Sequence, residues 1–170
     1  MVKVLLLASA GIAGVFAIIS ALKKKGPKVF GRICLEVQRP WSRKLLNGQK
    51  TIECRGYPLP ASLFGKELQV METPGGTILS RLEDHIEEGS DGLYLTGTVV
   101  FSGCKEYKTV KAWAADAELH CVPDDSPFAW HGEKGKLCFG WIVQSAELYD
   151  LPESVPQLNR VLRSLFKIVE

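Results

Sequence analysis

Apolar and polar residues are distributed differently in three parts of the chain. Residues 4–22 form an apolar run without a charged side chain, and as a helix this run would be about 28 Å long, close to the thickness of a membrane's hydrocarbon core. Residues 29–152 contain short strand-like stretches separated by turn-forming residues. We therefore predict a membrane anchor with a basic flank in residues 1–28 and a domain in residues 29–152. Apolar residues at helical spacing predict an amphipathic C-terminal helix, packed on this domain, in residues 153–170.

The body of the chain carries more strand signals than helix signals. The strongest lies at residues 93–101, which are rich in β-branched and aromatic side chains and are bounded by glycines. A short helix is predicted directly after Pro40, and another at residues 108–121, whose apolar residues share one helical face. Strands or extended segments are also predicted at residues 29–37, 50–55, 68–71, 128–130, 137–144 and 146–149. Several short strands with a helix after the first one favour a small mixed β-barrel of the α+β class.

The positive charge of the chain is concentrated near its beginning. Five of the 21 basic residues and none of the 19 acidic residues lie in residues 1–28, so the remaining residues carry a net charge of −3. A protein that follows a nucleic acid backbone usually has a domain-wide excess of basic residues, because each neutralised phosphate needs a cation nearby. The charge distribution argues against such extended contacts, and it predicts that a nucleotide or RNA partner is bound in a local pocket.

The apolar run predicts a single-pass membrane protein with the membrane contacted through residues 4–22. The run ends directly in Lys23, Lys24 and Lys25, and the positive-inside rule then places the body in the cytosol or an equivalent inner compartment. Small residues in the run, such as Gly11, would allow close packing with other helices of a membrane protein complex. The alternative is a cleaved secretory signal, which would make the protein secreted.

The cysteines, histidines and buried tryptophans carry no recognisable cofactor or metal motif. The five cysteines are odd in number and form no C-x-x-C pair, so neither a disulfide framework nor a zinc ribbon is indicated. They are interpreted as buried thiols. His120 and the neighbouring Cys121 are not assigned to a metal site, and Trp113 and Trp141 are assigned to the core. We expect no metal and no cofactor.

The densest group of chemically useful residues lies between residues 39 and 55. In an extended segment side chains alternate between two faces, so Thr51, Glu53 and Arg55 should share one face while Lys50 points to the other. A carboxylate next to a guanidinium can recognise a planar polar ligand through paired acceptors and donors, and Trp41 offers a ring on which a base could stack. The alternative is an ordinary surface ion pair with Trp41 in the core.

The same residues carry a resemblance to the ASCH family. The matching string is Pro40-Trp41, an apolar helix through Leu46, and then Gly48-x-Lys50-x-x-Glu53-x-Arg55, which resembles the ASCH signature G-x-K-x-x-E-x-R. Weaker similarities extend the match to about residues 31–152. The resemblance implies a PUA-like β-barrel with a cleft beside the motif, and recognition of RNA or of a modified nucleoside. It further implies that Lys50, Glu53 and Arg55 line this cleft and that Trp41 lies near its wall.

The resemblance also raises the question of catalysis. Some small bacterial relatives hydrolyse N4-acetylcytidine with a lysine, a threonine and a glutamate. Here Lys50 matches the lysine, but Glu53 occupies the threonine's place, and a downstream acid can be assigned only loosely, at Asp116 or Glu118. If the chain is an enzyme, Glu53 would act as general base and Lys50 would stabilise an oxyanion.

Three hypotheses follow from the sequence. The leading one is a non-catalytic, membrane-tethered ASCH domain that binds a nucleotide, a modified nucleoside or an RNA element through Trp41, Lys50, Glu53 and Arg55. The second is an amidohydrolase that acts on an acylated nucleoside such as N4-acetylcytidine. The third is a non-catalytic accessory subunit of a membrane complex. The first would be excluded by a cleft that the protein's own side chains fill.

Overall fold

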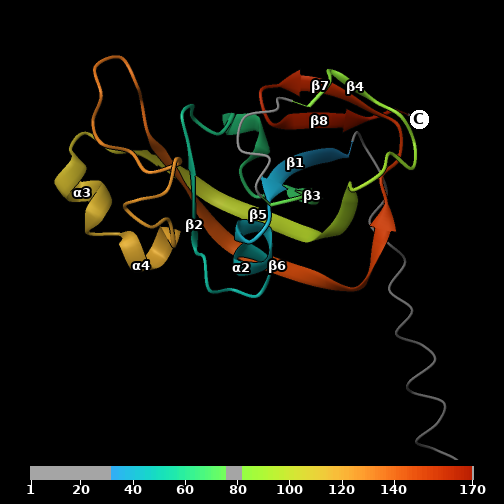
Figure 1. Cartoon of the computed structure of the whole chain (residues 1–170), viewed down its shortest axis with the longest axis horizontal. Helices are drawn as coiled ribbons and strands as arrows, with labels where there is room; N and C mark the ends of the chain where they lie inside the picture. Colours follow the sequence, from blue (N-terminus) through green and yellow to red (C-terminus); the bar gives the residue numbers. More distant parts are fainter. Residues whose placement is uncertain (1–31, 76–81, 170) are drawn as a thin grey trace, which may run out of the picture. The chain divides into compact units, whose positions relative to one another are not determined.

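The computed structural model describes residues 32–75 and 82–169 of the chain (Figure 1). The described strands are β1 (Ile33–Gln38), β2 (Ile52–Arg55), β3 (Glu67–Thr73), β4 (His85–Ile86), β5 (Tyr94–Glu106), β6 (Phe139–Ser154), β7 (Leu158–Leu162) and β8 (Leu165–Ile168). The described helical segments are short: α2 (Trp41–Leu46), η2 (Ala61–Leu63), α3 (Val110–Ala114) and α4 (Ala117–His120). The strands form one sheet in the order β2-β6-β5-β3-β1-β8-β7-β4.

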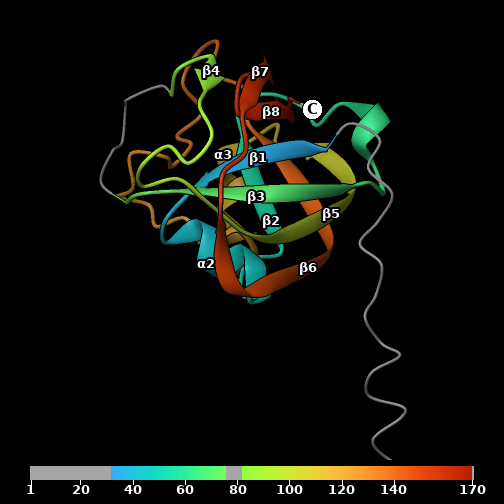
Figure 2. The ribbon, with the colours of Figure 1, turned by 90° about the vertical axis from the view of Figure 1, so that its right-hand side faces the viewer.

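The two longest strands, β5 and β6, give the sheet its curvature. They pair antiparallel from Tyr94 opposite Ser154 to Glu106 opposite Phe139, and the register shifts at three places along the pair. Each such irregularity bends the strands and increases their twist. Figures 1 and 2 show the result: the sheet curls, and β2, which pairs with the far edge of β6, comes round toward β1.

Apolar side chains and α2 fill the inner side of the curled sheet. The main core cluster includes Leu35, Val37, Leu45, Leu46, Leu68, Val70, Val99, Phe101 and Trp141. Gly97 of β5 lets α2 approach closely, because a Cβ atom there would lie 2.8 Å from Leu46 Cδ2 and 2.1 Å from the carbonyl oxygen of Glu147. Trp141 is fully buried and Trp113 is 2% exposed, so the assignment of both to the interior is confirmed.

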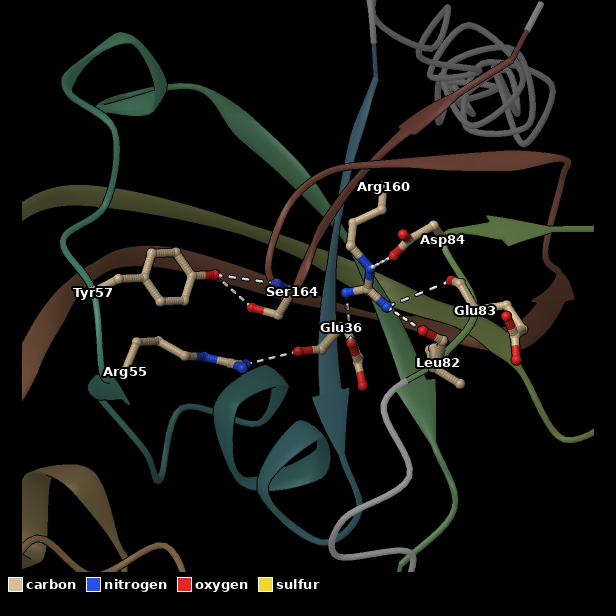
Figure 3. A network of polar contacts seen from close by, with 8 residues as sticks. All are labelled: Glu36, Arg55, Tyr57, Leu82, Glu83, Asp84, Arg160 and Ser164. Atoms are coloured by element: carbon tan, nitrogen blue, oxygen red, sulfur yellow. Dashed lines mark hydrogen bonds and ion pairs between the residues drawn. The ribbon is translucent and has the colours of Figure 1, made fainter. Parts of the chain in front are cut away.

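Side chains rather than a strand ladder connect β2 with β1. In the strand order β2 is an edge strand, with β6 as its strand partner. Arg55 Nη2 donates a hydrogen bond of 2.7 Å to the carbonyl oxygen of Glu36, and the Tyr57 hydroxyl lies 2.6 Å from Ser164 Oγ (Figure 3). We refer to the region between Glu36, Arg55, Tyr57 and Ser164 as the β1–β2 seam.

Arg160 of β7 ties the far end of the sheet to this seam. Its guanidinium lies over the Phe166 ring at 4.3 Å. It donates hydrogen bonds to the Leu82 carbonyl at 2.6 Å and to Asp84 Oδ1 at 2.8 Å (Figure 3). It also lies 3.9 Å from Glu36 Oε2. The side chain is only 7% exposed, so it holds the segment before β4 against β7 and β1.

The predicted C-terminal helix is wrong. The spacing of apolar residues in residues 153–170 indicates a helix, but the chain forms β7 and β8 there, joined by a turn in which Arg163 has φ of 43°. Leu158, Leu165 and Phe166 are buried, and β8 pairs antiparallel with β1. Pairing with a strand that is distant in sequence therefore overrides the local periodicity.

The predicted α+β barrel is also corrected. The described part of the chain is mainly strand, arranged as a curled half-barrel with a few short helices. The sheet is mixed, because β1 pairs parallel with β3 while the other pairs are antiparallel. The helix predicted at residues 108–121 is split into α3 and α4, and residues 128–130 do not form the predicted strand.

The predicted membrane anchor and membrane location are not retained. Within residues 32–75 and 82–169, no helix is long and apolar enough to cross a membrane. The predicted transmembrane segment, residues 4–22, and the alternative secretory signal lie outside the described residues. The transmembrane helix is therefore removed from the description of the fold.

Candidate functional site

Three of the four predicted ligand-binding residues meet at one buried carboxylate. Glu53 on β2 places its Oε1 2.8 Å from Arg55 Nε and its Oε2 3.4 Å from Lys50 Nζ. The side chains of Lys50, Glu53 and Arg55 are 2%, 7% and 19% exposed, respectively. The alternative prediction, an ordinary surface ion pair between Glu53 and Arg55 with a solvated Lys50, is therefore wrong.

Lys50 lies on the same side as Glu53, contrary to the alternation that the sequence predicts. Helix α2 ends at Leu46, and Gly48 follows with φ of +80°, a conformation that favours glycine. The amide of Lys50 then bonds back to the Lys44 carbonyl at 2.8 Å. Because β2 begins only at Ile52, the strand alternation does not apply to Lys50, and its side chain can turn toward Glu53.

Helices α3 and α4 cover the start of β2. Lys50 Nζ donates a hydrogen bond of 2.5 Å to the carbonyl oxygen of His120, and the Thr51 amide bonds to the Leu119 carbonyl at 2.9 Å. The His120 ring stacks on Trp113 with centroids 4.3 Å apart. These contacts close the site on its Lys50 side.

His120 is held as a neutral ring with a defined tautomer. Its Nδ1 accepts from the Val122 amide at 3.1 Å, so Nε2 carries the proton and donates to the Trp113 carbonyl at 3.1 Å. Burial lowers the pKa of His120, and the nearby Lys50 ammonium lowers it further. Sequence reasoning considered this histidine only as a metal ligand and missed its part in supporting the motif lysine.

The motif carboxylate keeps unused hydrogen-bonding capacity. Among the described residues, Glu53 Oε2 is buried and has no hydrogen-bond partner, since its contact with Lys50 has the geometry of an ion pair only. A buried oxygen without a partner costs about 1–3 kcal/mol. Arg55, beside it, is the most exposed of the three residues and lies at the β1–β2 seam (Figure 3).

Trp41, the fourth predicted site residue, lies in a different environment. Its ring packs edge-on against Phe128 with centroids 5.0 Å apart, and it also contacts the main core cluster. Within the described ranges no hydrogen bond or ring contact joins Trp41 to Lys50, Glu53 or Arg55. The structure therefore brings together three of the predicted residues and does not add the tryptophan to them.

A second buried carboxylate lies at the end of β3. Glu72 Oε2 accepts from Ser42 Oγ at 2.7 Å and lies 2.7 Å from Arg43 Nε, while Arg39 pairs with Oε1. Burial alone would raise the pKa of Glu72, but the hydrogen bonds from Arg39, Ser42 and Arg43 outweigh it and lower the pKa. Both carboxylate oxygens are satisfied, so this cluster fixes the entry to α2.

The described residues contain no group of three or more His, Cys, Asp or Glu side chains that could hold a metal ion.

The family resemblance offers two acids, Asp116 and Glu118, as a downstream catalytic group. Asp116 accepts a hydrogen bond of 2.6 Å from the Tyr107 hydroxyl and forms an ion pair with Lys105. Glu118 is exposed. Neither is joined to Glu53 by a hydrogen bond or ion pair in the described part of the chain.

Comparisons with known proteins found solved structures only. No family model and no curated protein matches this chain. An ASCH protein from Zymomonas mobilis is similar at 10% identity and a TM-score of 0.49, covering 82% of this chain and 88% of its own. Structures of two mutants of the ASCH protein from the same organism are also similar. One mutant matches at 10% identity and a TM-score of 0.46, covering 82% of this chain and 89% of its own. The other mutant matches at 11% identity and a TM-score of 0.48, covering 82% of this chain and 91% of its own. These are structures of the family that the motif resembles.

Proposed function

We propose that this protein is a non-catalytic binding module that recognises a nucleotide, a modified nucleoside or an RNA element at the β1–β2 seam. The observation that carries the proposal is the buried Glu53 carboxylate, whose Oε2 has no hydrogen-bond partner among the described residues. Buried polar atoms are normally satisfied, so an exception calls for a donor that the protein itself does not supply. The amino group of a base is such a donor.

Arg55 supplies the complementary half of this recognition. A guanidinium offers donors in a fixed plane, and a carboxylate beside it offers acceptors, so together they match the edge of a base that presents both kinds of group. Lys50 is closed off by the His120 carbonyl, whereas Arg55 is partly exposed, and among the described strands β2 pairs on one side only, with β6. The ligand therefore approaches from the Arg55 side and has to extend inward to Oε2, the oxygen on the Lys50 side of the carboxylate.

The geometry does not favour the amidohydrolase alternative. Thr51 is exposed, and its amide is bonded to Leu119. Lys50 Nζ is engaged by a backbone carbonyl and by Glu53, and Asp116 is bonded to Tyr107 and Lys105. No observation therefore supports a second candidate function.

The test is isothermal titration of the full chain with a panel of nucleosides, including N4-acetylcytidine, and with short RNAs. Arg55→Lys keeps the charge but loses the planar fork, so it should weaken binding at least about tenfold, equivalent to about 1.4 kcal/mol. Lys136→Arg, a change in an exposed ion pair outside the seam, is the matched control and should leave the dissociation constant unchanged. Trp41→Leu reports whether a neighbouring base stacks on that ring.

Two results would overturn the proposal. The first is the absence of heat with every nucleoside and RNA in the panel. The second is binding that Arg55→Lys leaves unchanged, because recognition would then lie outside the seam. Release of acetate from N4-acetylcytidine would instead restore the hydrolase hypothesis.

A further inference from the structure

Two cysteines from distant parts of the sequence meet on the outer face of β2. Cys54 lies on β2 opposite Gly140 of β6, and Arg55 lies opposite Phe139. Continuing this register places Cys138, two residues before Gly140, diagonally across from Cys54 on the same face of the sheet. Both cysteines belong to one small apolar cluster with Tyr107 and Trp113, under α3. Both are free thiols in this structure.

The surroundings make the two thiols chemically unequal. A hydrogen bond from Cys138 lowers the pKa of Cys54, as do the Lys50 ammonium and the Trp113 indole; burial and the Glu53 carboxylate raise it, and the net shift is downward. The hydrogen bond with Cys54 and burial raise the pKa of Cys138. Trp113 Nε1 has no conventional hydrogen-bond partner in the described part of the chain, so the Cys54 sulfur is the acceptor within its reach.

Cys54, whose pKa is lowered, is also the more exposed of the two cysteines. Cys54 is partly exposed, whereas Cys138 is 5% exposed. Cys104 on β5 lies opposite Trp141 and packs against the main core, so its side chain is on the other face of the sheet from Cys54. Cys34 is fully buried, and burial raises its pKa to about 12.

We propose that Cys54 and Cys138 form a reversible redox pair, in which Cys54 reacts first with a peroxide and Cys138 then closes a disulfide. In the first step the Cys54 thiolate attacks one peroxide oxygen, the O–O bond breaks, and a sulfenic acid and water are produced once a proton is taken up. In the second step the Cys138 sulfur attacks the sulfenic sulfur, the S–O bond breaks, and water leaves with the thiol proton. The peroxide is reduced by two electrons and the two thiols are oxidised.

The strand geometry indicates that this disulfide is easily reduced. Diagonal positions of an antiparallel pair have Cα atoms about 7–8 Å apart, at or beyond the usual upper limit for a disulfide. Cys138 precedes the first residue of β6 and can move more easily than a residue inside the ladder, although its carbonyl accepts from Tyr107. Strained disulfides have higher reduction potentials, which is the property of a labile pair rather than a structural one.

The experiment treats the full chain with hydrogen peroxide, blocks remaining thiols and digests with trypsin. Trypsin releases Cys54 in residues 51–55, which contain no other cysteine. We expect this peptide to be linked to the Cys138 peptide, with a mass lower by two hydrogen atoms than the sum, and to be released by dithiothreitol. In Cys138→Ser, Cys54 should accumulate as a sulfenic acid that dimedone traps; in Cys54→Ser the linked product should be absent. Cys104→Ser is the matched control, and after peroxide treatment it should give the same linked peptide as the wild-type chain.

The proposal is overturned if the unmodified protein keeps Cys54 and Cys138 reduced while other cysteines react. It is also overturned if the Cys54 peptide is linked to a cysteine other than Cys138, or if Cys104→Ser abolishes the linkage. The measurement on the unmodified chain decides the matter even where a serine variant folds poorly.

Discussion

Replacing Glu53 by glutamine tests the most unusual feature of the site, its buried group of one carboxylate and two cations. Glu53→Gln keeps the shape of the side chain but removes the negative charge that faces Lys50 at 3.4 Å and Arg55 at 2.8 Å. Breaking a buried ion pair from one side costs about 3–5 kcal/mol, because a buried charge is left without compensation. Lys50 keeps its bond to His120, and Arg55 keeps its bond to Glu36. We therefore expect a loss near the lower end, about 3 kcal/mol.

Urea unfolding of the full chain, followed by tryptophan fluorescence, measures this loss, because Trp113 and Trp141 are buried and should report on unfolding. The matched control is Glu133→Gln. Glu133 and Lys136 have the same spacing along the chain as Lys50 and Glu53, but their pair is exposed. The control should leave the urea midpoint unchanged, because exposed ion pairs add little to stability.

The outcome separates two descriptions of the motif. If Glu53→Gln costs less than about 1 kcal/mol with an unchanged denaturant slope, water reaches the carboxylate and the pair behaves like a surface pair. A desolvated recognition site at Glu53 would then be excluded. A loss of about 3 kcal/mol, with no change in the control, supports the burial on which the proposed function depends.

The remaining predictions concern the framework of the site. Gly97→Ala should destabilise the protein by about 3 kcal/mol, because its Cβ would lie 2.1 Å from the Glu147 carbonyl oxygen; Gly103→Ala, on the same strand with open space around it, should not. Glu72 has a lowered pKa in the folded protein, so its contribution is present above the unfolded pKa of about 4.5 and is lost as pH falls through the folded value. Urea unfolding midpoints of Glu72→Gln and the wild-type chain, measured at about pH 7 and pH 3, test this. The variant should be less stable than the wild type at pH 7, and the difference between their midpoints should be smaller at pH 3.

The sequence predicts the central strands of the curled sheet better than the C-terminal segment, residues 153–169. The segments at residues 29–37, 68–71 and 93–101 overlap β1, β3 and β5, because their side chains alternate or are β-branched in a way that suits a pleated sheet. At residues 153–170 the local spacing of apolar residues indicates a helix, and pairing with β1 decides otherwise. Such pairing between segments more than a hundred residues apart leaves no local signal.

The motif itself was found from the sequence, but its environment was not. The resemblance groups Lys50, Glu53 and Arg55 at one place, and the three side chains do converge, whereas the alternation of an extended segment wrongly places Lys50 on the face opposite Glu53. The cover provided by His120, and the place of Trp41 beside Phe128, depend on contacts between loops that are far apart along the chain. A residue pattern alone cannot supply such contacts, because they depend on how the loops fold back on the sheet.

Strand β2 shows why α3 and α4 belong to the site although they carry none of the motif. An edge strand exposes unpaired backbone groups and needs protection, and α4 provides it where the Leu119 carbonyl accepts the Thr51 amide. On the outer face α3 covers Cys54 with Trp113. On the inner face Glu53 and Arg55 remain at the seam with β1. One short strand thus presents the groups of the proposed recognition site on one face and the thiol of the proposed redox pair on the other, and the same helical cover limits access to both.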